Sequence, residues 1–214
     1  MLSKLVRTSA LVLVTLLLGS TIWAQSAEIT GSSLENPRAA TTVTYSLNGT
    51  MGPILAGTDP LGLNGQSASV TVKANAALKP VKHTATSATY KLPKGAISGQ
   101  AGSDKFTTTT PSQMVIVAGK RSSLTLAFTV SSSGQKIVVK DVTDLAANSF
   151  TRAALKHPTA FSPSPQNVTA AQKKGGPGCQ FYYLVEGNRT DLGFSGTASS
   201  GGNSADAEFE DEDQ

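Results

Sequence analysis

Few residues of this 214-residue chain could perform acid–base, nucleophilic or metal chemistry. It contains two histidines, His83 and His157, and one cysteine, Cys179. A serine triad needs a base histidine beside a nucleophile elbow, and the chain has no Gly-x-Ser-x-Gly segment. A Cys179–His157 pair would supply a nucleophile and a base, but no motif surrounds either residue. Two histidines without close spacing predict no zinc site. We therefore expect no catalytic residue, no metal and no cofactor.

The carboxylates give the main alternative to a non-catalytic protein. Glycoside hydrolysis needs two carboxylates that face each other across a sugar. The expected folded body contains six, at Asp59, Asp104, Asp141, Asp144, Glu186 and Asp191. Glu186 and Asp191 flank an expected hairpin, where acids are usually solvated turn residues. An enzyme that acts on extracellular polysaccharide through carboxylates is therefore the alternative that stays open.

The charges divide between a basic body and an acidic tail. The formal net charge is +4, but six of the 14 acidic residues lie in the last nine positions, 206–214. Two basic pairs, Lys173-Lys174 and Lys120-Arg121, and the aromatic Tyr182 are the candidate binding residues. They indicate contact with an anionic cell-envelope or extracellular polymer rather than nucleic acid. The charge split also predicts that the acidic tail covers a basic patch of the body.

The N-terminus has the pattern of an export signal. Lys4 and Arg7 precede an apolar run from Ala10 to Leu18, and small Ala24 follows a short polar stretch. This order is typical of a signal peptide that is cleaved after residue 24. The apolar run is about half the ~20 residues that a spanning helix needs, so we expect no membrane span after cleavage. The predicted location is extracellular or periplasmic, in a bacterium, and the oligomeric state is unknown.

Period-2 alternation of apolar and hydroxyl-bearing residues predicts an all-β fold. The expected strands lie near residues 42–47, 68–74, 84–92, 96–98, 105–109, 114–117, 124–130, 136–142, 180–185 and 190–196. Nine or ten short strands with turns between them favour a single antiparallel β-sandwich, or a barrel-like sheet. The predicted organisation is a signal peptide at 1–24, a flexible leader at 25–40, the β-domain at 41–198, and a disordered Ser/Gly linker with the acidic tail at 199–214.

Two further details concern the loops and the ends of the sheet. Residues 48–65 are rich in Gly and Pro and are expected to form a loop, with Leu61 and Leu63 tucked under it. The pattern Leu47-Asn-Gly-Thr recurs as Phe194-Ser-Gly-Thr near the other end of the domain. Either these two strands are neighbours in the sheet with matching glycines, or the match is a coincidence in a chain rich in Gly and Thr.

Several segments resemble uncharacterised secreted β-rich proteins of environmental bacteria. They are Tyr45-Ser-Leu-Asn-Gly-Thr, Asp59-Pro-Leu-Gly-Leu-Asn-Gly-Gln, Tyr90-Lys-Leu-Pro-Lys-Gly-Ala and Phe106-Thr-Thr. The resemblance implies a sandwich-like fold and no established activity, so it assigns no functional residues. Taken together, the expected function is an exported, non-catalytic protein with a binding or structural role at the cell exterior, with anionic polymer as its ligand.

Overall fold

Twelve β-strands make up most of the computed structural model, which describes residues 42–132, 134–170 and 178–202. The strands are β1 (Thr42–Ala56), β2 (Ser67–Asn75), β3 (Lys82–His83), β4 (Ser87–Leu92), β5 (Ile97–Ala101), β6 (Asp104–Thr107), β7 (Ser112–Val117), β8 (Ser123–Ser132), β9 (Gln135–Asp144), β10 (Gln166–Ala170), β11 (Gly178–Val185) and β12 (Asn188–Gly201). One 3-10 turn, η1 (Arg152–Leu155), precedes β10. The expected signal peptide, the leader and the acidic residues of the tail lie outside the described residues.

All twelve strands belong to one mixed sheet with the order β3-β4-β7-β8-β9-β11-β10-β12-β1-β2-β5-β6. The fold is therefore all-β, as predicted, but two details of the prediction are wrong. The strands number twelve, because β3 and β10 form in segments that read as turn and irregular chain. The sheet is also not purely antiparallel, since β10 and β11 run parallel, with Thr169 opposite Gly178.

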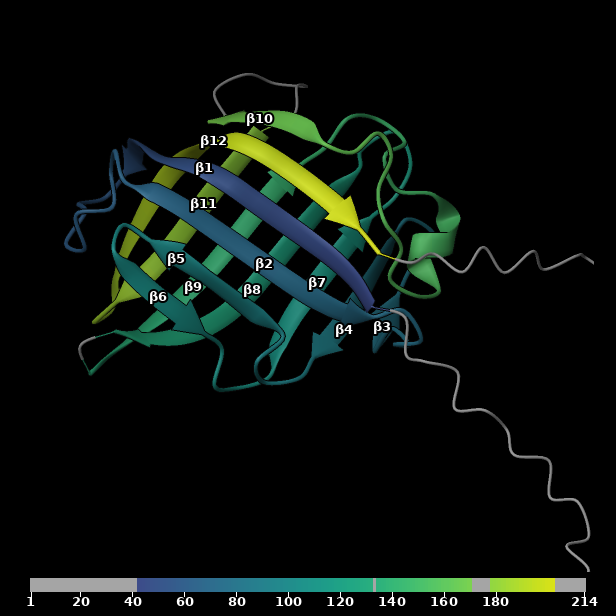
Figure 1. Cartoon of the computed structure of the whole chain (residues 1–214), viewed down its shortest axis with the longest axis horizontal. Coiled ribbons are helices and arrows are strands. Elements are labelled where there is room, and N and C mark those ends of the chain that lie inside the picture. The colour runs from purple at the N-terminus through teal and green to yellow at the C-terminus, as the bar shows by residue number, and fades with distance from the viewer. Residues whose placement is uncertain (1–41, 133, 171–177, 203–214) are drawn as a thin grey trace, which may run out of the picture. The chain divides into compact units, whose positions relative to one another are not determined.

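The sheet curls so that its two halves face each other. In Figure 1, β1, β2 and β5 lie in front of β7, β8 and β9. The edge strand β6 lies against β8, where the rings of Phe106 and Phe128 stack with centroids 5.7 Å apart. The Ser132 hydroxyl of β8 also donates a hydrogen bond to the Asp104 carboxylate of β6, at 3.3 Å. The curl therefore places a hydrophobic core between the two halves.

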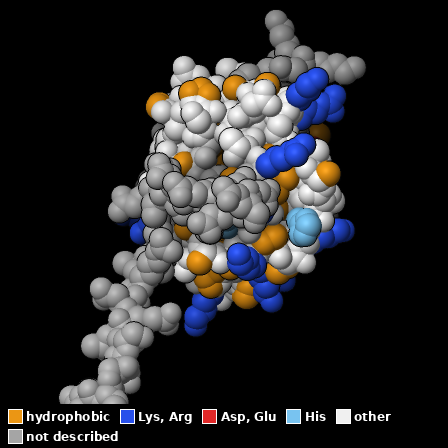
Figure 2. All heavy atoms as spheres, turned by 90° about the vertical axis from the view of Figure 1, so that its right-hand side faces the viewer, with side chains coloured by type: hydrophobic (Ala, Val, Ile, Leu, Met, Phe, Trp, Pro, Cys, Tyr) orange, Lys and Arg blue, Asp and Glu red, His pale blue; other side chains and the backbone are white. Residues whose placement is uncertain are grey.

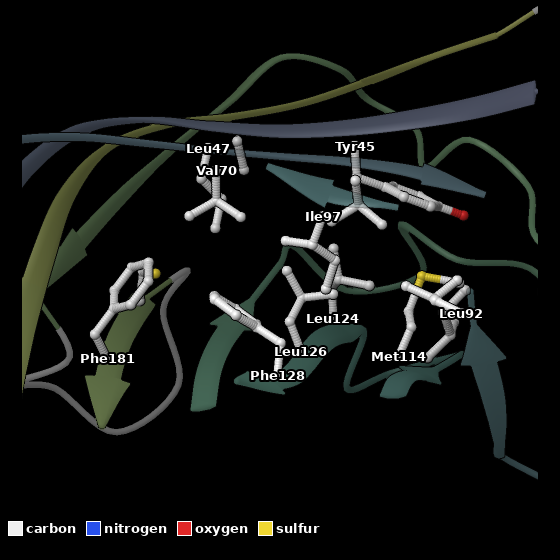
Figure 3. Close-up of a cluster of buried hydrophobic side chains, with 14 of the residues drawn as sticks. Tyr45, Leu47, Val70, Leu92, Ile97, Met114, Leu124, Leu126, Phe128 and Phe181 are labelled. Carbon is white, nitrogen blue, oxygen red and sulfur yellow. The ribbon is translucent and has the colours of Figure 1, made fainter. Parts of the chain in front are cut away.

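The core consists of the inward-facing residues of the alternating strands. Figure 3 shows Leu47 and Val70 on one side of it and Leu124, Leu126 and Phe128 of β8 on the other. All five are at most 4% exposed. Burying a side chain of this size stabilises a fold by about 1.5–3 kcal/mol relative to leaving it in water. The strands expected near residues 124–130 and 136–142 form a hairpin, because β8 and β9 pair along their whole length.

Strands β1 and β12 are neighbours in the sheet. β1 and β12 are antiparallel, and Gly49 lies directly opposite Gly196. The shared sequence pattern thus marks neighbouring strands and is not a coincidence. β1 also continues to Ala56, so residues 48–56 are strand rather than loop, because β12 supplies hydrogen-bond partners along them. The loop begins only at Gly57, and Leu61 and Leu63 do pack against the core.

Within the described ranges, no helix has the length and hydrophobicity that crossing a membrane requires.

Candidate functional site

An open groove with a volume of about 730 Å³ lies where the β7–β8 loop meets the segment that leads into η1. Its floor is apolar and includes the partly exposed Val117 and Leu155, together with Phe150, which is only 1% exposed. Three cationic side chains also line it: Lys120, Arg121 and Arg152. All three are exposed, so they can reach a ligand that enters from solvent. The groove therefore combines an apolar floor with a positively charged rim.

Hydrogen bonds to the backbone fix the two segments that form this groove. The Ser122 hydroxyl donates to the Gly119 carbonyl at 3.0 Å and accepts from the Phe150 N–H at 3.1 Å. The Asn148 N–H donates to the same Gly119 carbonyl at 2.8 Å. Ser122 is 2% exposed, so these bonds are protected from competition by water. The loop that carries Lys120 is thus locked to the segment that precedes η1.

A buried tyrosine holds η1 in place. The Tyr90 hydroxyl of β4 donates a hydrogen bond of 2.7 Å to the carbonyl oxygen of Ala154, inside the 3-10 turn. Both residues are fully buried. Burial raises the pKa of Tyr90 to about 12, so the phenol stays protonated and remains a donor at neutral pH. The position of Arg152, on the same turn, is therefore set by the core of the sheet.

Described carboxylates do not neutralise the groove. Among the residues that the structure describes, the one ion pair joins Arg189 to Asp191, on another part of the sheet. Figure 2 shows the face that carries η1: Lys and Arg side chains lie around hydrophobic ones, and no described side chain in view is acidic. The exposed Asp144 pairs in register with Ser123, two residues after Arg121, but forms no ion pair with the groove cations. The three cations thus remain available to an anionic ligand, which is the electrostatic character of an anion-binding site.

The structure separates the residues that the sequence singled out. Lys120 and Arg121 meet in the groove, whereas Lys173 and Lys174 lie outside the described residues. Tyr182 on β11 pairs in register with Lys140 of β9. Lys140 lies four residues before Asp144, the end of β9 that pairs with Ser123 beside the groove, so Tyr182 lies away from the groove. Arg152 was missed. Nothing in the sequence around Arg152 shows that this segment packs beside Lys120.

Tyr182, the aromatic candidate binding residue, does not present a free ring to a ligand. The guanidinium of Arg189 lies 4.4 Å from the centroid of its ring. The same guanidinium forms two hydrogen bonds with Asp191, at 2.6 and 3.0 Å. The Tyr182 hydroxyl donates to Gln180 at 2.7 Å, and the residue is half-buried. One ring face is therefore occupied by a cation–π contact from within the chain. Asp191, expected to be a solvated turn residue, is instead an ion-pair partner.

A second polar cluster is enclosed in the core. The Cys179 thiol donates a hydrogen bond to Oδ1 of Asp141 at 3.2 Å, and the Thr143 hydroxyl donates to Oδ2 at 3.3 Å. All three residues are at most 1% exposed. Burial raises the pKa of Asp141 to about 7, although both hydrogen bonds act to lower it. Burial, with the nearby Asp141, also raises the pKa of Cys179 well above its usual value.

This cluster shows that Cys179 is a buried residue and explains its chemistry. A reactive cysteine needs a depressed pKa and access to solvent. Cys179 instead has a raised pKa and no exposure to solvent. The hydrogen bonds instead satisfy a carboxyl group that would otherwise be buried without a partner, which is costly. The cluster is thus a structural feature of the core, and His157 forms no part of it.

The described carboxylates are dispersed rather than paired across a groove. Asp141 lies in the core, Asp191 binds Arg189, and Asp59 holds a loop by accepting a hydrogen bond from Tyr183 at 2.5 Å. Among the described residues, no group of three or more His, Cys, Asp or Glu side chains is arranged to hold a metal ion.

Comparison with known proteins returns no family model that matches this chain, and no match among curated proteins or solved structures. The resemblance to secreted β-rich proteins therefore remains an expectation from the sequence.

Proposed function

We propose that this chain is an exported, sandwich-like β-protein that binds anionic extracellular polymer through the groove of Lys120, Arg121 and Arg152. The observation that carries the proposal is the convergence of three exposed cations on one groove without a described carboxylate partner. The predicted signal peptide supports an exterior location, where polysaccharides bearing carboxylate or sulfate groups are the available polyanions. The basic body, with 16 basic against eight acidic residues at positions 25–205, supports attraction of such chains.

The shape of the groove supports binding of a chain segment. Its volume of about 730 Å³ lies within the ~300–1,000 Å³ that is usual for ligand pockets. Val117 and Leu155, which are partly exposed, offer apolar contact to the carbon faces of sugar rings, while the two arginines can each bind a carboxylate or sulfate with two hydrogen bonds. The groove is open, so a polymer can enter and leave it laterally.

The test is binding of polygalacturonate and dextran sulfate to the purified protein, with neutral dextran as the ligand control. We expect binding of the two polyanions only. Affinity should fall steeply as salt rises from about 0.05 to 1 M, because the Debye length then shrinks to about 3 Å.

A matched pair of variants locates the binding surface. The triple variant Lys120→Gln, Arg121→Gln, Arg152→Gln should lose most of the polyanion affinity, by tenfold or more. The control triple Lys91→Gln, Lys136→Gln, Lys140→Gln removes the same charge from exposed strand positions outside the groove. It should lose no more than a few-fold. Equal losses in the two triples would show that binding follows net charge and not the groove, and would reject the proposal.

A further inference from the structure

We propose that the acidic segment 206–213 of this same chain is an internal ligand of the groove, which it occupies in competition with external polymer. This inference deepens the proposed function by adding a regulator to the same site. It rests on where the last strand ends, on the reach of the chain beyond it, and on the match between the segment and the groove in charge and in apolar character.

The last strand ends close to the groove. The Ser200 hydroxyl accepts a hydrogen bond from the Phe161 N–H at 2.9 Å and donates to the Phe161 carbonyl at 3.2 Å. The ring of Phe161 packs edge to face on Phe150, with centroids 5.8 Å apart, and Phe150 lines the groove. Two side-chain contacts therefore connect the end of β12 to the groove. Figure 1 shows the β12 arrow pointing towards the end of the molecule that carries η1.

The acidic segment is long enough to reach the groove. An extended chain spans about 3.3–3.6 Å per residue. Asp206 can thus lie up to roughly 14 Å from Gly202, and Asp213 up to roughly 40 Å. Both lengths exceed each of the two contacts that connect β12 to the groove, which measure 2.9 Å from Ser200 to Phe161 and 5.8 Å between the rings of Phe161 and Phe150.

The segment complements the groove in two ways. It holds six carboxylates, at Asp206, Glu208, Glu210, Asp211, Glu212 and Asp213. These match the exposed cations of the rim. Among these carboxylates is one aromatic residue, Phe209, which suits the apolar surface that Val117 and Leu155 present in the groove. An aromatic anchor flanked by Glu208 and Glu210 is a more specific fit than charge attraction alone.

Tethering makes even a weak contact effective. A ligand on a short linker has an effective concentration in the millimolar range. A segment with millimolar intrinsic affinity would therefore occupy the groove about half of the time. External polymer would have to displace it, and displacement becomes easier as salt screens the contact. Polymer affinity should consequently depend on the tail at low salt and not at high salt.

The first measurement needs no polymer. A fluorescent peptide of residues 203–214 is titrated with the full chain in which the six tail acids are changed to their amides, so that the groove is free. We expect saturable binding, several-fold weaker for a Phe209→Ala peptide and abolished when the chain also carries the triple Lys120→Gln, Arg121→Gln, Arg152→Gln. Absence of saturable binding, or retention of it in the groove triple, overturns the inference.

The second measurement uses the intact chain and polygalacturonate. Neutralising the six tail acids should raise polymer affinity several-fold at low salt, and this gain should vanish in the groove triple. No gain overturns the regulatory role. A salt-sensitive dimer that disappears with the neutral tail would show exchange of tails between two copies, and would overturn the intramolecular form. If the peptide binds the groove but no polyanion does, the proposed function fails while the internal ligand stands.

Discussion

The thiol of Cys179 on β11 lies 3.2 Å from Oδ1 of Asp141 on the neighbouring strand β9, and neither residue is exposed to solvent. Cys179 pairs in register with Thr143, which also donates to the Asp141 carboxyl group. An ionisable group is thus held inside a hydrophobic core by two weak donors and no cation. This arrangement makes fold stability depend on pH.

The stability of the protein should fall between about pH 4 and pH 7. The folded-state pKa of Asp141 is raised by burial to about 7, against 3.8 for the ordinary group. The folded state therefore binds a proton that the unfolded state has released, and each pH unit in this window costs up to about 1.4 kcal/mol. The stabilising contribution is complete below pH 3.8 and is lost by about pH 7.

The variant Asp141→Asn should abolish this dependence, since an amide stays neutral. Relative to the unmodified chain, its free energy of unfolding should rise by a few kcal/mol between pH 4 and pH 7 in urea denaturation. The exposed Asp104→Asn serves as the control, and its profile should parallel that of the unmodified chain. A constant difference between Asp141→Asn and the unmodified chain across this range would contradict a protonated Asp141.

Cys179 should be inert in the folded protein. Its thiol is buried and its pKa is raised, so both access and thiolate formation are suppressed. Ellman's reagent should label it only at the rate at which the chain unfolds, and at once in denaturant. An added cysteine at exposed position 103, as Ser103→Cys, should react immediately in the folded state. Fast labelling of Cys179 in the unmodified protein would show that the core is open.

Gly196→Ala should destabilise the pairing of β1 with β12. A Cβ atom at this position would lie 2.6 Å from the Cα of Gly49, and it would also strike the carbonyl oxygen of Asn48. Forcing extra volume between packed backbones costs about 1–3 kcal/mol. Gly201→Ala, near the end of the same strand, is the control because a Cβ there meets nothing within 4 Å. Similar thermal midpoints for the two variants would refute the close approach.

Tyr183→Phe should loosen the loop that follows β1. The Tyr183 hydroxyl donates to Asp59, which also accepts from the Asn64 N–H at 2.7 Å. Partial burial alone would raise the pKa of Asp59, but these hydrogen bonds outweigh it and lower that pKa. Losing a hydrogen bond to a charged group costs about 1.5–3 kcal/mol.

The expected result is lower stability at pH 7 and faster proteolysis of residues 57–66 in Tyr183→Phe. The matched control is Tyr182→Phe, which removes a hydroxyl bonded to Gln180 on the outer face. The effect of Tyr183→Phe should shrink as pH falls through the lowered pKa of Asp59, because the protonated acid no longer offers a charged acceptor. Equal rates of proteolysis in the two variants would show that the Tyr183 hydroxyl does not stabilise the loop.

Local patterns in the amino-acid sequence are sufficient to predict individual strands and turns. Alternation of Leu124, Leu126, Phe128 and Val130 with polar residues predicts a half-buried strand, and the turn at Ser131–Gly134 predicts its hairpin with the next strand. Both are local consequences of side-chain period and turn chemistry, so they can be read without the fold. The basic pair Lys120-Arg121 can also be identified from the sequence alone.

Which strands pair and which loops contact each other depends on the tertiary structure. Strand β10 forms because the neighbouring β12 offers hydrogen-bond partners, and no local pattern encodes that. Residues 136–142 could present either face to the core; pairing with β8 turns Asp141 inward. Arg152 joins Lys120 only because Ser122 and Asn148 tie two distant loops together. Sequence periodicity specifies which residues share a face, whereas contacts between distant segments depend on how the whole sheet curls and closes its core.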